Sequence, residues 1–239
     1  MHYDIAPDFR QLYEQRINEY GDSFRANGHS PYAFRLRRKL YNYVLGQKLP
    51  SEARSRPVTI LDSGCGNGTM SPAFRKHLQI IRLVGIDYVA EACRIAERIY
   101  YYDQTVLGNV LDLPSKISER FDVVNSCEVF LYIPPEQRLA FWQSHAAMLK
   151  PGGWMILLIP NIQCFFRKIK PVSNAWGYSF NLDTVLADIQ AFPWLRVLSI
   201  SGISMITGRT FDLPVDGQAT LKRITAFEIA LVLEHDSTC

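Results

Sequence analysis

Three glycines at alternate positions follow an acidic residue at the end of an apolar run. The run Val58–Ile60 leads to Asp62, and Gly64, Gly66 and Gly68 come next. A buried strand that turns through such glycines into a helix lets the backbone approach a ligand closely, because a Cβ at those positions would clash. The pattern therefore predicts a cradle for a nucleotide-sized ligand.

A second acidic residue, Asp87, ends the apolar segment Leu83–Ile86. An acid at the carboxyl end of the strand next to a glycine loop can accept hydrogen bonds from both hydroxyl groups of a ribose. Asp87 also precedes a helical pattern around Ala92–Ile99, so capping that helix is the alternative role. The spacing from the glycine loop favours the ribose.

Three further segments complete the pattern, namely Gly108–Pro114, Arg120–Glu128 and Leu149–Trp154. In this order, the five segments resemble those of the class I S-adenosylmethionine-dependent methyltransferases, over roughly residues 56–161. The resemblance implies methyl transfer from S-adenosylmethionine to a small-molecule acceptor by in-line displacement at an oxygen, nitrogen or carbon atom. The cofactor carries the reactivity, and the protein positions the reactants.

The resemblance also implies roles for individual residues around the cofactor. They are Asp62, Ser63, Gly64 and Gly66 about the methionine part, Asp87 at the ribose, Tyr88, Asn109 and Val110 at the adenine, and Ser126 and Cys127 facing the sulfonium and the acceptor. Asn109 stands where the family commonly has an aspartate, and an amide can also bond the adenine amino group.

One position departs from the family in a way that bears on catalysis. Many relatives have a histidine where this chain has Tyr132, between Leu131 and Ile133. A histidine base is therefore absent there, and Tyr132 is equally well read as a packing residue at the mouth of the cofactor site. The candidates for a catalytic base are Glu128, Tyr132 and His29. An exposed turn residue is the simpler interpretation of His29. A surface or packing residue is the simpler interpretation of His145.

The elements that would position these residues alternate strands with helices. Strands are predicted at Val58–Asp62, Ile81–Ile86, Thr105–Asn109, Phe121–Ser126, Trp154–Pro160, Leu195–Ser201 and Ala226–Glu234. Helices are predicted around Asp8–Tyr20, 31–45, Ala92–Ile99, 135–149 and after Asn181, from their caps and 3.6-residue periodicity. The resemblance implies an α/β, Rossmann-like, seven-stranded sheet, mostly parallel, with an antiparallel last strand and helices on both faces.

The predicted organisation is an N-terminal helical appendage over residues 1–50 and a methyltransferase domain over 51–239. The appendage would lie on the acceptor side as a lid, and Arg35, Arg38 and Asn42 share one face of its second helix; a solvated face is the alternative. Residues 161–180 are aromatic and basic in an irregular stretch, which predicts an insert that binds the acceptor. Phe165–Lys168 would be the point of any peripheral membrane contact.

Composition excludes several other classes. No apolar run reaches the length of a membrane span, and we see no signal peptide, so a cytoplasmic location is expected. Five scattered cysteines without a C-x-x-C pair predict reduced thiols and no metal site. A net charge of +3 does not indicate nucleic acid binding.

Two alternative functions remain open from the sequence. A dehydrogenase that uses NAD(P) would have glycine at position 69, where Thr69 stands, and would lack Asp62. A non-catalytic partner protein that binds the cofactor would keep the glycine loop, so cofactor binding alone does not separate it from an enzyme. The oligomeric state is not indicated.

Overall fold

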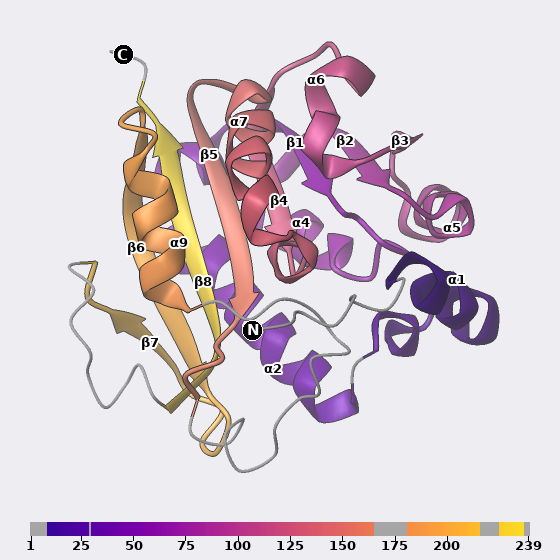
Figure 1. Ribbon diagram of the computed structural model, residues 1–239, viewed down its shortest axis with the longest axis horizontal. Helices are drawn as coiled ribbons and strands as arrows, with labels where there is room; N and C mark the ends of the chain where they lie inside the picture. Colours follow the sequence, from indigo (N-terminus) through magenta and orange to yellow (C-terminus); the bar gives the residue numbers. More distant parts are fainter. Residues whose placement is uncertain (1–8, 29, 165–180, 216–224, 237–239) are drawn as a thin grey trace.

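The computed structural model describes residues 9–28, 30–164, 181–215 and 225–236 (Figure 1). Within these residues, eight strands form one sheet in the order β3-β2-β1-β4-β5-β8-β6-β7. The strands are β1 Pro57–Ser63, β2 Gln79–Asp87, β3 Gln104–Leu107, β4 Phe121–Cys127, β5 Leu149–Pro160, β6 Leu195–Ser204, β7 Thr210–Leu213 and β8 Ala226–His235. All seven predicted strands are present.

Strands β1 to β5 run parallel, and β8 lies antiparallel between β5 and β6. This arrangement confirms the predicted α/β sheet with its antiparallel last strand. The prediction of seven strands was wrong by one, because β7 adds a short antiparallel edge to β6. The segment lies at the edge of the sheet directly before Pro214, a residue typical of turns, and no strand was predicted there.

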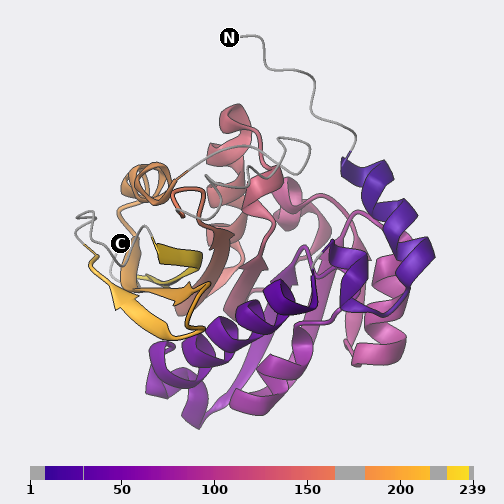
Figure 2. The ribbon, with the colours of Figure 1, turned by 90° about the horizontal axis from the view of Figure 1, so that it is seen from below.

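Helices cover both faces of the sheet, with α2 and α4 on one side and α7 and α9 on the other (Figure 2). The α-helices are α1 Phe9–Tyr20, α2 Pro31–Tyr43, α3 Ser51–Ser55, α4 Ser71–His77, α5 Ala90–Tyr100, α6 Leu113–Lys116, α7 Arg138–Ala147 and α9 Leu182–Gln190. Short 3₁₀ turns are η1 Phe24–Asn27, η3 Val110–Asp112, η4 Phe130–Tyr132 and η5 Pro135–Gln137, and η2 Val44–Lys48 is a π-turn.

Two predicted helix caps are confirmed in atomic detail. The Ser30 side chain accepts a hydrogen bond from the Ala33 N–H at 3.2 Å, and Asn181 accepts one from Thr184 at 2.9 Å. Each satisfies an N–H group of the first helical turn that has no partner within the helix. These caps fix where α2 and α9 begin.

The core has two halves because successive strand residues point to opposite faces. In β1, Ile60 packs with Leu40 of α2, whereas Leu61 packs with Phe141 and Trp142 of α7. All five side chains are fully buried. The sheet is therefore covered on both faces at β1 and β4, the strands that end in Asp62 and Ser63 and in Ser126 and Cys127.

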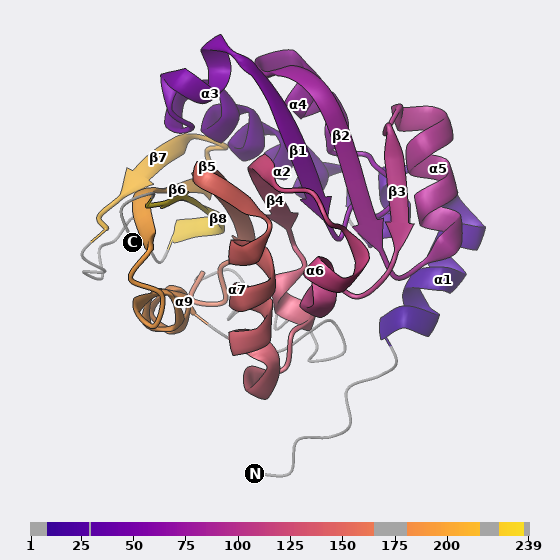
Figure 3. The ribbon, with the colours of Figure 1, turned by 90° about the horizontal axis from the view of Figure 1, so that it is seen from above.

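The first helix packs outside these two halves, beside α5 (Figure 3). Ile17 of α1 is buried against Ala92 and Ile95 of α5, together with Ala26 of η1. This small cluster holds the N-terminal helix next to the glycine loop rather than on the body of the sheet.

Candidate functional site

The glycine loop is tied by its backbone to the neighbouring strand. The N–H groups of Gly64 and Cys65 both donate to the Ile86 carbonyl oxygen, at 2.8 and 3.0 Å. Gly64 and Gly66 have φ angles of +72° and +54°, a left-handed region that favours glycine. A Cβ on Gly64 would lie 2.2 Å from Val129 Cγ2. The loop thus requires glycine for both its conformation and the space around it.

Asp87 joins the glycine loop to the start of α5. Its Oδ2 accepts from the Gly66 N–H at 2.9 Å, and its Oδ1 accepts from the Val89 N–H at 3.0 Å. Burial raises the pKa of Asp87 to about 6, although these backbone hydrogen bonds act in the opposite direction. The N-cap of α5 is Val89, so Asp87 holds the residue before the helix and does not itself cap it. The same carboxylate lines the cavity.

Asp62, at the end of β1, lies in a chain of buried hydrogen bonds. Its Oδ1 accepts from Asn125 Nδ2 at 2.7 Å and its Oδ2 from the Tyr102 hydroxyl at 2.5 Å. The Tyr41 hydroxyl of α2 in turn donates to Asn125 Oδ1. Burial raises the pKa of Asp62. The network fixes the carboxyl ends of β1 and β4 relative to α2.

Asn67, inside the glycine motif, holds the N-terminal segment over the loop. Its Nδ2 donates to the carbonyl oxygens of Gly21 and Ser23, at 2.9 and 3.0 Å. Asn27 donates back to Asn67 Oδ1 and Thr69 Oγ1, at 3.2 and 3.0 Å. These contacts were not predicted from the sequence, although Asn67 lies within the glycine motif and Thr69 directly follows it.

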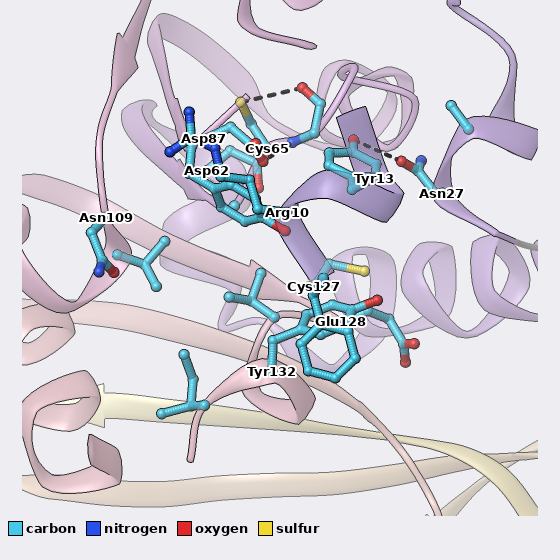
Figure 4. Close-up of a pocket in the computed structure, with 18 of the residues that line it drawn as sticks. Arg10, Tyr13, Asn27, Asp62, Cys65, Asp87, Asn109, Cys127, Glu128 and Tyr132 are labelled. Atoms are coloured by element: carbon cyan, nitrogen blue, oxygen red, sulfur yellow. Dashed lines mark hydrogen bonds between the residues drawn. The ribbon is translucent and has the colours of Figure 1, made fainter. Parts of the chain in front are cut away.

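A cavity of about 820 Å³ opens where α1 meets the carboxyl ends of β1, β2 and β4 (Figure 4). Its volume falls in the range of small-molecule sites, roughly 300–1,000 Å³. Eight of the ten predicted cofactor residues line it: Asp62, Gly64, Gly66, Asp87, Tyr88, Asn109, Val110 and Cys127. Segments far apart in the sequence therefore meet at one cavity.

The other two predicted residues, Ser63 and Ser126, do not line the cavity. Both are fully buried because their side chains point away from the cavity, and Ser63 hydrogen-bonds to His145 Nε2 at 2.8 Å. His145 Nδ1 contacts the Phe141 carbonyl oxygen at 2.7 Å, which makes Nδ1 the donor and Nε2 the acceptor. Burial lowers the pKa of His145 to about 4. The packing role expected for this histidine is the one observed.

Glu128 follows β4 and sits in an unusual backbone conformation, with φ of +61°. Its Oε2 lies 3.0 Å from Arg37 Nη2 of α2, and the same nitrogen lies 2.9 Å from Glu228 Oε1 of β8. Arg37 was not predicted as a site residue, yet it falls on the stripe of Ala33 and Leu40, which faces the core. Its place on this core-facing stripe was the feature of the sequence that could have identified Arg37 as a site residue.

Tyr132 lies in η4 at the same side of the cavity as Glu128. Its ring packs against Phe9 of α1, with ring centroids 5.1 Å apart. Burial, together with the charge of Glu128, raises the pKa of Tyr132 to about 12, whereas Arg37 and Arg16 act in the opposite direction. Tyr132 therefore keeps its proton at neutral pH.

Three predictions about the acceptor side have separate outcomes. His29 and residues 165–180, with Phe165–Lys168, lie outside the described residues. Arg35 and Arg38 are exposed and do not line the cavity, which matches the solvated face. Among the described residues, no three His, Cys, Asp or Glu side chains gather as metal ligands would, and no helix is long and apolar enough to cross a membrane.

Residues 60–153 match the family described as a methyltransferase domain. This segment of the chain is therefore similar to methyltransferase domains. The chain is 30% identical over 97 residues to a ubiquinone biosynthesis O-methyltransferase of Coxiella burnetii, with 39% of this chain and 40% of that protein covered. It therefore spans about two fifths of the length of that curated relative.

Solved structures extend the likeness of the fold to nearly the whole chain. The methyltransferase from the complex with the Haloferax volcanii Trm112 methyltransferase activator has a TM-score of 0.65 at 17% identity, covering 94% of this chain and 97% of that one. The N-methyltransferase NodS of Bradyrhizobium japonicum, with bound S-adenosylhomocysteine, has a TM-score of 0.62 at 17% identity, covering 94% and 98%. The class I methyltransferase fold thus includes the sheet beyond the matched domain.

Proposed function

We propose that this protein is an enzyme that transfers a methyl group from S-adenosylmethionine to a small-molecule acceptor. One observation carries the proposal: the glycine loop and Asp87 meet at a single cavity with Glu128 and Tyr132 at its other side. The family match at residues 60–153 supports it. The solved relative NodS, which has the same fold, contains S-adenosylhomocysteine.

The residues around the cavity fit this cofactor. The left-handed turn at Gly64 and Gly66 forms part of the cavity wall, where the methionine part would lie. Asp87 would accept the ribose hydroxyls, and Tyr88 and Val110 would flank the adenine. Asn109 Oδ1 already accepts from the Leu111 N–H at 3.0 Å, which holds the amide at the cavity wall. When bound, S-adenosylmethionine supplies an electrophilic methyl group.

The protein's own part in the reaction is positioning. The Asp62 network fixes β1 and β4, so the glycine loop and Cys127 keep a set distance across the cavity. Burial raises the pKa of the Cys127 thiol, which therefore stays neutral and presents no competing nucleophile to the methyl group. Of the two candidate bases within the described residues, Glu128 remains, because Tyr132 retains its proton.

The division of the chain is also part of the proposal. Residues 1–50 would form the lid on the acceptor side, 51–239 the methyltransferase domain, and 161–180 an insert that binds the acceptor. The lining of the cavity by Phe9, Tyr13 and Arg37 supports the first assignment. A cytoplasmic location is proposed on the unpaired state of the cysteines among the described residues.

Calorimetry with S-adenosylhomocysteine and with NAD tests the cofactor assignment. We expect binding of S-adenosylhomocysteine and none of NAD. Binding of NAD alone would favour the oxidoreductase, against which Thr69 already stands: its hydroxyl accepts from Asn27 where a dinucleotide fingerprint needs glycine. Turnover of labelled S-adenosylmethionine in an acceptor screen separates an enzyme from a non-catalytic partner protein.

A further inference from the structure

A tyrosine of the N-terminal helix stands directly over the glycine loop. The Tyr13 hydroxyl oxygen lies 2.7 Å from the position that a Cβ on Gly66 would occupy. Tyr13 also lines the cavity, as Gly66 does. Helix α1 thus brings one polar atom to the part of the cavity where the methionine part of the cofactor is proposed to bind.

The direction of the hydrogen bonds around Tyr13 can be traced from the backbone. One side-chain atom of Asn67 contacts the carbonyl oxygens of Gly21 and Ser23, at 2.9 and 3.0 Å. Carbonyl oxygens only accept hydrogen bonds, so this atom is the amide nitrogen, and the other polar atom of the Asn67 side chain is its oxygen. The amide of Asn67 therefore has a single orientation.

The orientation of Asn67 determines that of Asn27. Asn27 contacts Asn67 Oδ1 at 3.2 Å, and this contact requires the amide nitrogen of Asn27 as donor. The same nitrogen donates to Thr69 Oγ1 at 3.0 Å. The oxygen of Asn27 therefore faces Tyr13, and the Tyr13 hydroxyl donates to it at 3.0 Å (Figure 4).

The single proton of the Tyr13 hydroxyl is thus committed to Asn27. A phenol oxygen also has lone pairs, and within the described part of the chain no hydrogen-bond donor contacts them. Burial raises the pKa of Tyr13 well above its ordinary value, and the charge of Asp87 acts in the same direction, so the hydroxyl keeps its proton. Toward a ligand, Tyr13 is therefore a hydrogen-bond acceptor.

An acceptor at this place distinguishes the two polar groups of methionine. The ammonium group only donates hydrogen bonds, whereas the carboxylate only accepts them. A carboxylate against the Tyr13 oxygen would meet lone pairs and no proton. Arg10 and Arg16 of α1 also line the cavity, and because guanidinium groups only donate, the carboxylate suits them better than it suits Tyr13.

Resting on the proposed function, we propose that Tyr13 positions the cofactor, its hydroxyl oxygen accepting a hydrogen bond from the α-ammonium group of S-adenosylmethionine. Asn67, within the glycine motif, fixes the polarity of that contact through Asn27. The ammonium group then lies toward Tyr13, and the carboxylate lies away from it. The hydrogen bonds that hold the N-terminal segment on the glycine loop thus also select which group of the methionine part binds there.

Three ligands that differ only in the methionine part test this contact by calorimetry. They are S-adenosylhomocysteine, the analogue in which hydrogen replaces its carboxylate, and the analogue in which hydrogen replaces its amino group. We expect Tyr13→Phe to weaken binding of the first two about 10-fold or more, because a hydrogen bond from a charged group is lost. Binding of the analogue without the amino group should stay within about twofold of the parent protein.

Tyr100→Phe is the matched control. The Tyr100 hydroxyl donates to the Asp22 carbonyl oxygen at 2.9 Å, so it also holds the N-terminal segment, but Tyr100 does not line the cavity. Any change of affinity in Tyr100→Phe should therefore be the same for all three ligands. A loss in Tyr100→Phe that depends on the amino group would attribute the effect to loosening of the segment and would overturn the proposal.

Asn27→Leu tests the polarity of the contact. It keeps the shape of the side chain but removes the oxygen to which Tyr13 donates, so the hydroxyl can turn its proton toward the ligand. The factor by which S-adenosylhomocysteine binds more tightly than the analogue without the amino group should fall at least about 3-fold. An unchanged factor would contradict the role given to Asn27.

The other possible outcomes for Tyr13→Phe also decide the question. An equal loss for all three ligands would place the contact at the ribose or the adenine, and a loss confined to the two ligands with a carboxylate would make Tyr13 a donor. Either result, or an unchanged affinity for S-adenosylhomocysteine, overturns the proposal. If the parent protein does not bind S-adenosylhomocysteine, the proposed function fails; if it binds without the selective loss, only the role of Tyr13 fails.

Discussion

The backbone N–H of Gly66 donates to Asp87 Oδ2 over 2.9 Å, which joins the glycine loop to the end of β2. One carboxylate thus serves the backbone and faces the cavity that we assign to the cofactor. The same side chain supports the loop whether or not a ligand is bound. Its charge is the part of this arrangement that a ribose would use.

Asp87→Asn keeps the size of this side chain and removes its charge. We expect S-adenosylhomocysteine to bind about 10- to 150-fold more weakly, since a hydrogen bond to a charged group contributes about 1.5–3 kcal/mol. Calorimetry measures the change, with Glu91→Gln on the exposed side of α5 as control. An affinity equal to that of the parent protein would remove Asp87 from the ribose site.

Asn67→Ala should release the N-terminal segment from the glycine loop. The substitution removes donors to the carbonyl oxygens of Gly21 and Ser23, and the expected loss is about 1–3 kcal/mol of unfolding free energy. Limited proteolysis should show faster cleavage within residues 9–28. Asn42→Ala, at a partly exposed amide of α2, is the control. Equal protease resistance in the two variants would contradict the proposal that Asn67 holds the N-terminal segment on the glycine loop.

Gly64→Ala separates steric crowding from backbone strain. Both Gly64 and Gly152 have positive φ, at +72° and +70°, but a Cβ meets Val129 at 2.2 Å in the first and nothing within 4 Å in the second. Gly64→Ala should therefore lower the unfolding free energy by about 1–3 kcal/mol more than Gly152→Ala. Urea denaturation measures both, and equal losses would contradict the clash.

Buried His145 should make the protein less stable in mild acid. Its folded pKa of about 4 lies below the ordinary 6.5, so between these values the unfolded chain binds a proton that the folded chain does not. Protonation of His145 in the unfolded chain lowers the unfolding free energy by about 2 kcal/mol from pH 7 to pH 5. Asp87, with its pKa raised to about 6, opposes the change in this interval.

Comparison of the parent protein with His145→Gln isolates the contribution of His145 to the pH dependence of stability. In the variant, the free energy of unfolding from urea titrations should fall less between pH 7 and pH 5, or rise. A fall as large as that of the parent would show that His145 does not cause it.

The strands were predictable because their signals are local. β1 and β5 contain short, largely apolar runs, Val58–Leu61 and Trp154–Pro160, as strands buried on both faces should, and the caps at Ser30 and Asn181 mark helix starts directly. The predicted strand began only at Trp154, because Gly152 and Gly153 before it are residues typical of turns. A Cβ on Gly153 would lie 2.9 Å from the Lys150 carbonyl oxygen, so close backbone packing, not a turn alone, requires that glycine.

The candidate site was predictable only on its cofactor side. There the residues follow consecutive strands, whose carboxyl ends a parallel sheet brings together. The side of the cavity near Glu128 is held by pairs that are distant in sequence, such as Arg37 with Glu228, and no periodicity in the sequence indicates them. Ser63 and Ser126 were misplaced because a motif gives positions along a strand, whereas the pleat decides which side chains face the cavity.

The Arg37–Glu228 pair also determines which part of the cavity forms last during synthesis of the chain. Its partners are 191 positions apart, and β8 must enter the sheet between β5 and β6 before the pair can form. The glycine loop and Asp87 can assemble from the first half of the chain. The contacts that hold Glu128 and Arg37 are completed only after residue 228 has left the ribosome. The protein should thus acquire its nucleotide cradle early and its acceptor site last.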